Sequence, residues 1–140
     1  MITILSSLFS GPLTAYGENL QLAIDDDQQQ AVAGSQLFQP DYFAEFMGDL
    51  AARRGTDDLL ALTSIWSKWY FCFLAPTVAA NLLLQRELPI ALSDVGVTLS
   101  AEGKPLGLRL PHDGSSLPPC SPFERFSTLI QGHLEPVIEV

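Results

Sequence analysis

Basic residues are scarce in this sequence. Lysine and arginine together number 7, against 16 aspartate and glutamate residues, and the 140-residue chain carries a formal net charge of −9. A nucleic-acid-binding protein needs a basic face for the phosphates, and anionic lipid attracts basic segments in the same way. The composition therefore argues against a nucleic-acid partner and against electrostatic docking on a membrane surface.

Cysteine is almost as rare. The chain has 2 cysteines, Cys72 in an apolar run and Cys120 in a proline-rich segment, and they make no disulfide framework. A single bridge between them is compatible with the sequence, but we expect a reduced, cytoplasmic protein. The N-terminus lacks the positively charged segment of a secretory signal, which favours a mature start.

No hydrophobic run reaches the length of a membrane span. The longest candidate, Tyr70 to Leu84, has 15 residues, whereas a transmembrane helix needs about 20. Pro76 and Asn81 interrupt it, and Lys68 and Arg86 flank it. We therefore predict a buried helix here and no association with membranes.

The usual catalytic and metal-binding motifs are missing too. There is no CxxC, no HExxH and no glycine-rich phosphate loop, and His112 and His133 have no partner at metal-ligand spacing. Asp25, Asp26 and Asp27 lack the glycine and glutamate of a calcium-binding loop, so we interpret them as a solvated acidic loop. The sequence thus predicts no catalytic residue, no metal ligand and no cofactor held by this chain.

What the chain does contain predicts a mainly helical α+β fold, with three to four helices packed on one antiparallel β-hairpin. Helical periodicity dominates the middle of the sequence, and period-two alternation follows it. We expect a single domain over residues 1–140. Its parts are an N-terminal arm with the acidic loop (1–35), a helical core (36–88), the hairpin (89–111) and a C-terminal helix (121–140).

Proline, glycine and capping residues mark the ends of the helices. Pro40 begins a helix that Gly55 ends, and Thr56 is a suitable N-cap for the next one. Pro76 removes a backbone donor, which predicts a kink or a split into two helices near Leu74.

The last third of the chain combines a hairpin and a helix. Val95 to Ser100 and Pro105 to Leu110 alternate apolar and polar residues on either side of a Glu102–Gly103 turn. Ser121 and Glu124 have the spacing of a capping box, so a helix begins there. The predicted apolar face of that helix consists of Phe123, Phe126, Leu129, Ile130 and Leu134.

An aromatic stripe is the most unusual feature. In the stretch SIWSKWYFCFLAP, aromatic residues recur at i, i+3, i+4 and i+7. One interpretation is a stacking wall for an aromatic or catecholate-like ligand, with nearby cations supplying charge. The other is helix core, with one indole N–H bonded to a loop carbonyl; the sequence leaves both open. The candidate ligand-binding residues are Trp66, Lys68, Trp69, Tyr70 and Arg86.

The order of these elements resembles the FhuF-type ferric siderophore reductase family over about residues 35–140. Three stretches carry the resemblance. The first is Ser64–Pro76, with its serine, tryptophan, Trp-Tyr pair, apolar run and proline, and the second is the hairpin region from Pro89 to Leu110. The third is Glu124–Val140, in which the residues TLI and a short gap are followed by an apolar residue, proline and two aliphatic residues. The resemblance implies cytoplasmic reduction of siderophore-bound iron(III) and release of iron(II).

The family's [2Fe-2S] cluster is held by four cysteines near the C-terminus, and the two cysteines of this chain match none of them. The resemblance therefore implies the siderophore-facing portion of a reductase system. Its partners would be a ferric siderophore and an electron donor or second subunit bound through the apolar C-terminal end. Two alternatives remain, a non-catalytic protein-interaction module and a domain related to the C-terminal part of siderophore synthetases.

Overall fold

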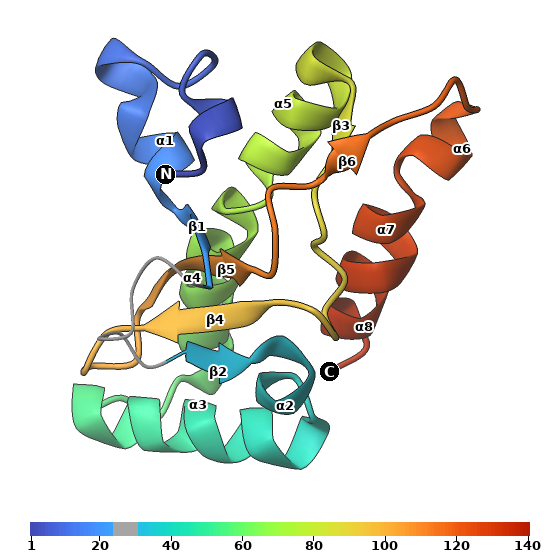
Figure 1. Cartoon of the computed structure of the whole chain (residues 1–140). Helices are drawn as coiled ribbons and strands as arrows, with labels where there is room; N and C mark the ends of the chain where they lie inside the picture. Colours follow the sequence, from blue (N-terminus) through green and yellow to red (C-terminus); the bar gives the residue numbers. More distant parts are fainter. Residues whose placement is uncertain (24–30) are drawn as a thin grey trace.

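A four-stranded mixed sheet lies at the centre of the computed structural model, which describes residues 1–23 and 31–140 (Figure 1). The strand order is β1 (Leu20–Leu22), β5 (Pro105–Leu110), β4 (Gly96–Leu99) and β2 (Ala31–Ala33). β1 runs parallel to β5, while the other neighbours are antiparallel. The mainly helical α+β fold class is confirmed, and Asp25, Asp26 and Asp27 lie outside the described residues.

The predicted hairpin forms the middle of this sheet. β4 and β5 pair antiparallel with Val97 opposite Leu108, and the register shifts after Thr98. The prediction of one hairpin alone was incomplete, because β1 and β2 add a strand on each side. Each added strand has three residues, which is too short for an alternating pattern to stand out in the sequence.

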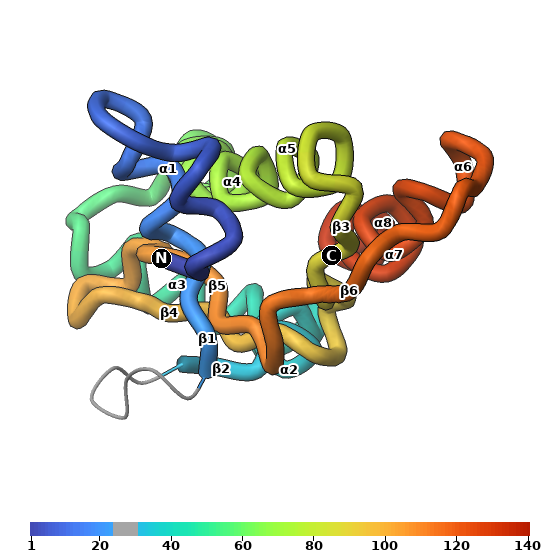
Figure 2. The backbone as a smooth tube through the Cα atoms, turned by 45° about the horizontal axis from the view of Figure 1, so that its top comes forward, coloured from blue at the N-terminus to red at the C-terminus, as the bar shows by residue number. Residues whose placement is uncertain are grey.

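The helical core agrees closely with the sequence pattern. α3 (Pro40–Arg54) ends at Gly55, which has a left-handed φ of 64°. α4 (Leu59–Cys72) and α5 (Ala75–Leu84) are separate helices, with Pro76 in the first turn of α5, so the predicted split is confirmed. In Figure 2 the two helices follow one another along one side of the molecule.

The predicted N-cap of α4 was wrong by two residues. Asp58 is the N-cap, and its carboxylate accepts a hydrogen bond of 2.9 Å from the Ala61 N–H. Thr56 instead accepts from the Asp58 N–H at 3.2 Å, and so holds the capping residue in place. An aspartate caps at least as well as a threonine, so local sequence does not decide between them.

The predicted N-terminal arm contributes to the hydrophobic core of the domain. Two single 3-10 turns (Thr3–Leu5 and Gly11–Leu13) precede α1 (Thr14–Glu18), which contacts α5. Ile2 and Leu5 are fully buried in the main hydrophobic core. The segment is therefore part of the domain core, together with the short α2 (Gly34–Leu37) that follows β2.

The C-terminal region is broken where one helix was predicted. The small sheet of β3 (Arg86–Glu87) and β6 (Ser115–Ser116) leads to α6 (Pro122–Arg125), α7 (Ser127–Leu129), a π-helical turn (Ile130–Leu134) and α8 (Glu135–Ile138). The helix count is consequently higher than three to four. The predicted capping box of Ser121 and Glu124 is confirmed.

Pro136 explains part of this irregularity. It has no N–H to donate to the carbonyl of Gly132, four residues earlier. That carbonyl accepts instead from the Leu92 N–H, at 2.7 Å, and so ties the π-helical turn to the segment before β4. The apolar face also differs from the prediction, because Phe123 and Ile130 are exposed.

Among the described residues, no helix is long and apolar enough to cross a membrane.

Candidate functional site

The aromatic stripe of α4 divides between core and surface. Trp66 is 4% exposed and Tyr70 0%, whereas Trp69 is 45% exposed. At about 100° per residue, Tyr70 lies about 40° to one side of Trp66 and Trp69 about 60° to the other. Since α4 packs against β5 and α3, the side of the stripe that carries Trp69 faces outward. Trp66 thus fits the core interpretation, whereas for the exposed Trp69 the ligand-binding interpretation stays a prediction.

Trp66 joins α4 to the hairpin turn. Its indole Nε1–H donates to the carbonyl oxygen of Gly103 at 3.0 Å. Its ring stacks on Tyr70 with centroids 5.5 Å apart, and it makes T-shaped contacts with Phe43 and Phe46 of α3. The Trp66 indole thus has its polar atom and most of its surface engaged by the protein itself.

Trp69 stands at the surface with a cation over it. The Lys104 ammonium nitrogen lies 3.4 Å from the centroid of the indole ring, a cation–π contact. Lys104 immediately precedes β5, so α4 and the sheet meet at this point. Trp69, Lys104 and Pro105 together line two adjoining cavities, and we call the two cavities with their shared wall the groove.

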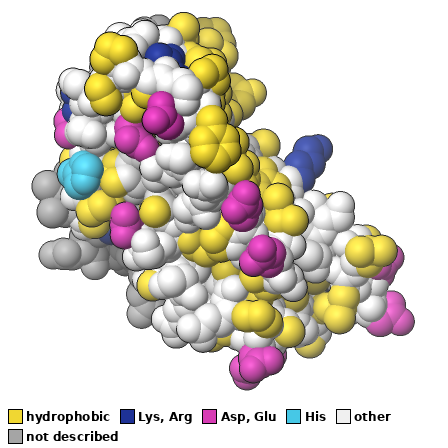
Figure 3. Space-filling model, turned by 90° about the vertical axis from the view of Figure 1, so that its right-hand side faces the viewer, with side chains coloured by type: hydrophobic (Ala, Val, Ile, Leu, Met, Phe, Trp, Pro, Cys, Tyr) yellow, Lys and Arg dark blue, Asp and Glu magenta, His cyan; other side chains and the backbone are white. Residues whose placement is uncertain are grey.

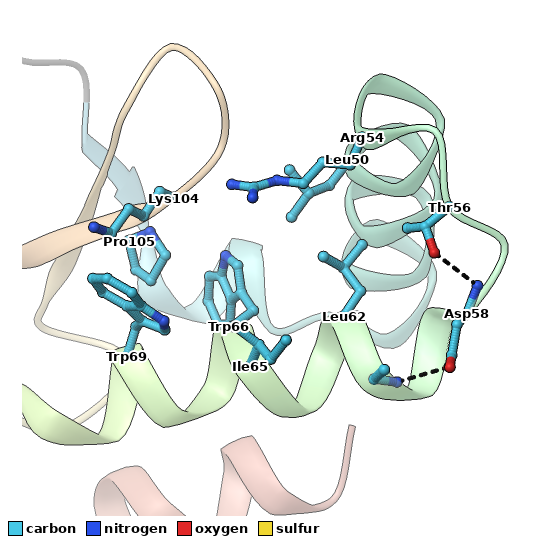
Figure 4. A pocket seen from close by; sticks show the side chains of 11 residues that line it. Leu50, Arg54, Thr56, Asp58, Leu62, Ile65, Trp66, Trp69, Lys104 and Pro105 are labelled. Carbon is cyan, nitrogen blue, oxygen red and sulfur yellow. Dashed lines mark hydrogen bonds between the residues drawn. The ribbon is translucent and has the colours of Figure 1, made fainter.

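The α3–α4 cavity is the larger half of the groove, about 580 Å³ in volume. Figure 4 shows Leu62, Ile65 and Trp66 rising from α4 as its apolar floor, while Arg54 reaches from the end of α3 toward Lys104. Asp58 lies at the far end, where its carboxylate caps α4. The cavity therefore combines apolar walls with two cations, Arg54 and Lys104.

The α1–α4 cavity, on the other side of Trp69, has a volume of about 480 Å³. Tyr16 of α1 and Lys68, Cys72 and Phe73 of α4 contribute to its lining. Lys68 is exposed and adds a second cation that the α3–α4 cavity does not share. Cys72 is an exposed free thiol.

Arg86 does not belong to this groove. It lies in β3, where its guanidinium donates to the Gly114 carbonyl at 2.8 Å and pairs with the Asp113 carboxylate at 3.6 Å. It lines neither cavity. Of the five candidate binding residues, the structure brings Trp66, Lys68 and Trp69 to the groove and places Tyr70 in the core beneath it. Arg86 instead joins β3 to the segment that precedes β6.

A buried pair lies behind the groove. The Tyr70 hydroxyl is 2.8 Å from Nε2 of His133, and Nδ1 of His133 faces the Ile90 carbonyl. A carbonyl only accepts, so Nδ1 carries the proton, and Nε2 accepts from the Tyr70 O–H. Burial raises the pKa of Tyr70 and lowers that of His133, whose Ile90 contact opposes the shift, so both groups stay neutral.

The groove is also a local exception to the charge of the chain. Acidic side chains are spread among apolar ones on the face formed by the right-hand side of Figure 1 (Figure 3). Three of the 7 basic residues (Arg54, Lys68 and Lys104) line the groove, and Asp58 is the one carboxylate among its described lining. Three cations thus stand against one carboxylate in this lining, a local excess of positive charge that attracts anions.

Metal ligands are not gathered in the described part of the chain. No group of three or more histidine, cysteine, aspartate or glutamate side chains there could hold a metal ion. A four-cysteine [2Fe-2S] site does not fit a chain with 2 cysteines.

Sequence reasoning missed Lys104, Arg54 and His133. Lys104 is separated from Trp69 by the whole of α5 and β4, so no local pattern connects the two. Arg54 reads as a cation at a helix C-terminus, and nothing local aims it at α4. His133 did carry a signal, because it falls at helical spacing from Leu129 and Ile130 on the predicted apolar face.

The chain matches no protein-family model, and no curated protein matches it. The resemblance to the FhuF type therefore stays a prediction, and the fold and the groove define the protein as a small α+β domain with an aromatic, cation-lined surface site.

Proposed function

We propose that this chain is the siderophore-facing part of a cytoplasmic ferric siderophore–iron reductase system. It would bind the ferric siderophore so that iron(III) is reduced and iron(II) released. The observation that carries the proposal is the groove, where an exposed tryptophan and three cations meet in a chain with a net charge of −9.

The size and lining of the groove suit a small chelate. Cavities of about 300–1,000 Å³ with apolar walls and a few charged groups are typical of small-molecule sites, and each half of the groove lies in this range. Trp69 offers stacking area at low entropic cost, because its position is already held by Lys104. Arg54 and Lys68 add charge for a ligand that is anionic.

Electrons would come from a partner. The resemblance implies a [2Fe-2S] cluster bound by four cysteines, and this chain has 2. An electron donor or second subunit therefore has to approach the bound chelate. The apolar C-terminal end is a candidate contact for it, because Ile138 of α8 is 72% exposed while Val137 packs against the core.

Tryptophan fluorescence tests the binding step directly. We expect saturable quenching when the purified chain is titrated with a panel of ferric and iron-free siderophores. Trp69→Phe should remove most of this signal, because it deletes the exposed indole. Trp66→Phe is the comparison variant: it deletes the buried indole but keeps an aromatic ring in the floor of the α3–α4 cavity, so the quenching of Trp69 should remain.

A flat response to every siderophore, from a chain folded by circular dichroism, would refute the proposal. It would favour the alternative of a non-catalytic interaction module. The observation that favours this second candidate is the exposure of Phe123 and Ile138. If these side chains form a self-association surface, light scattering should show the mass of the particles rising with the concentration of the chain. The relation to siderophore synthetases stays a prediction.

A further inference from the structure

The two halves of the groove repeat one arrangement around a shared wall. Trp69, Lys104 and Pro105 line both cavities. Each cavity then adds a cation of its own, Arg54 on the α3 side and Lys68 on the α1 side. A flat apolar surface beside a cation thus occurs once in each cavity, and the ammonium group of Lys104 lies on the wall that the two cavities share.

The chemistry of each half selects for a flat group with negative charge. An aromatic ring stacks on an indole or packs on apolar side chains, and phenolate or carboxylate oxygens pair with guanidinium and ammonium groups. The Lys104 ammonium, now over the indole face, is attracted by the same oxygens. Trp66 cannot supply a polar contact to a ligand, because the Gly103 carbonyl already takes its only N–H.

We propose that the groove takes a metal chelate whose arms are anionic aryl groups, of the catecholate class, with one arm in each cavity and Trp69 between them. This inference rests on the proposed function and narrows its ligand. A ferric hydroxamate, in which the charges of the ligand balance that of the metal, offers neither an aryl face nor net negative charge. A catecholate chelate offers both.

The probes are two gallium(III) complexes, one of a tris-catecholate with dihydroxybenzoyl arms and one of a linear trihydroxamate. Gallium(III) has the charge and coordination preference of iron(III) but is not reduced, so calorimetry measures binding alone. We expect one catecholate complex per chain, bound at least about tenfold more tightly than the hydroxamate, a difference of about 1.4 kcal/mol.

Four variants locate the arms. Trp69→Leu should abolish the preference for the catecholate, and Trp69→Phe should restore most of it because a stacking face returns. Arg54→Met and Lys68→Met should each weaken catecholate binding several-fold, since each removes the cation of one cavity. Arg125→Met is the matched control, because Arg125 belongs to α6 and lines neither cavity.

The outcomes separate the two proposals. If both complexes bind equally and Trp69→Leu changes neither, aryl recognition is wrong while chelate binding stands. If either Arg54→Met or Lys68→Met leaves catecholate affinity unchanged, the two-arm arrangement is overturned. If neither complex binds the folded chain, the proposed function fails and this inference with it.

Discussion

Removing the hydroxyl of Tyr70 changes one atom at the centre of the core. In Tyr70→Phe the ring keeps its stacking on Trp66, at a centroid distance of 5.5 Å, and no apolar surface is lost. Nε2 of His133, however, loses the donor that lies 2.8 Å away. Both side chains are 0% exposed, so no water replaces the lost hydrogen bond.

The expected cost follows from that loss. A buried acceptor left without a partner costs about 1–3 kcal/mol, so Tyr70→Phe should lower the free energy of unfolding by that amount. Urea denaturation followed by circular dichroism measures it, and the slope against urea should not change. Tyr16→Phe is the control, because the Tyr16 side chain is 53% exposed and its hydroxyl should contribute less than about 0.5 kcal/mol.

The same pair predicts how stability depends on pH. Burial holds the pKa of His133 below its ordinary value, which is about 6.5 in an unfolded chain. As the pH falls below about 6.5, the unfolded state binds a proton that the folded state resists, so stability is lost, by up to about 1.4 kcal/mol per pH unit. Above that pH both states are neutral and the contribution of His133 is constant.

Carboxylates act in a lower pH range. Hydrogen bonds from Ser121 lower the pKa of Glu124, and a hydrogen bond with Ser100 lowers that of Glu102. Their contributions are therefore lost only as the pH falls below the ordinary range of a glutamate. Between about pH 6.5 and pH 5 the slope should be absent in His133→Gln. A slope that persists there, or a Tyr70→Phe cost under about 0.5 kcal/mol, would refute a buried, neutral Tyr70–His133 pair.

Three further predictions concern single sites. Gly107→Ala should destabilise the fold by about 1–3 kcal/mol, because the new Cβ would lie 2.3 Å from the carbonyl oxygen of Asn19, the residue before β1. Gly48→Ala has open space in mid-helix and should stabilise the fold by about 0.5–1 kcal/mol. Equal effects of the two substitutions in thermal melts would contradict the close packing of β1. Asp58→Ala should cost about 1 kcal/mol through loss of the α4 cap, and an unchanged urea midpoint would show that another residue caps the helix. Trp66→Ala should cost about 3–5 kcal/mol, while Trp69→Ala should keep the domain folded; the reverse order in urea denaturation would place Trp69 in the core.

Several features could be predicted from local sequence alone. Pro40 and Gly55 bound α3, Pro76 separates α4 from α5, Ser121 and Glu124 form their capping box, and the alternation around Gly103 gives the hairpin. Each depends on backbone chemistry within a few residues: a fixed φ, a missing N–H or a capping oxygen. Such constraints act in any tertiary context, so the sequence shows them.

Only the tertiary structure decided which aromatic residue is core and which is surface. Trp66 and Trp69 are three positions apart on one helix, and the packing of α3 and β5 against α4 buries the first and leaves the second exposed. The approach of Lys104 to Trp69, and of Tyr70 to His133, joins residues that are far apart in the sequence. Composition established a chain poor in cations and without catalytic or metal-binding motifs. Lys68 adjoins Trp69 in the sequence, but only folding brings Arg54 and Lys104 to the same exposed indole.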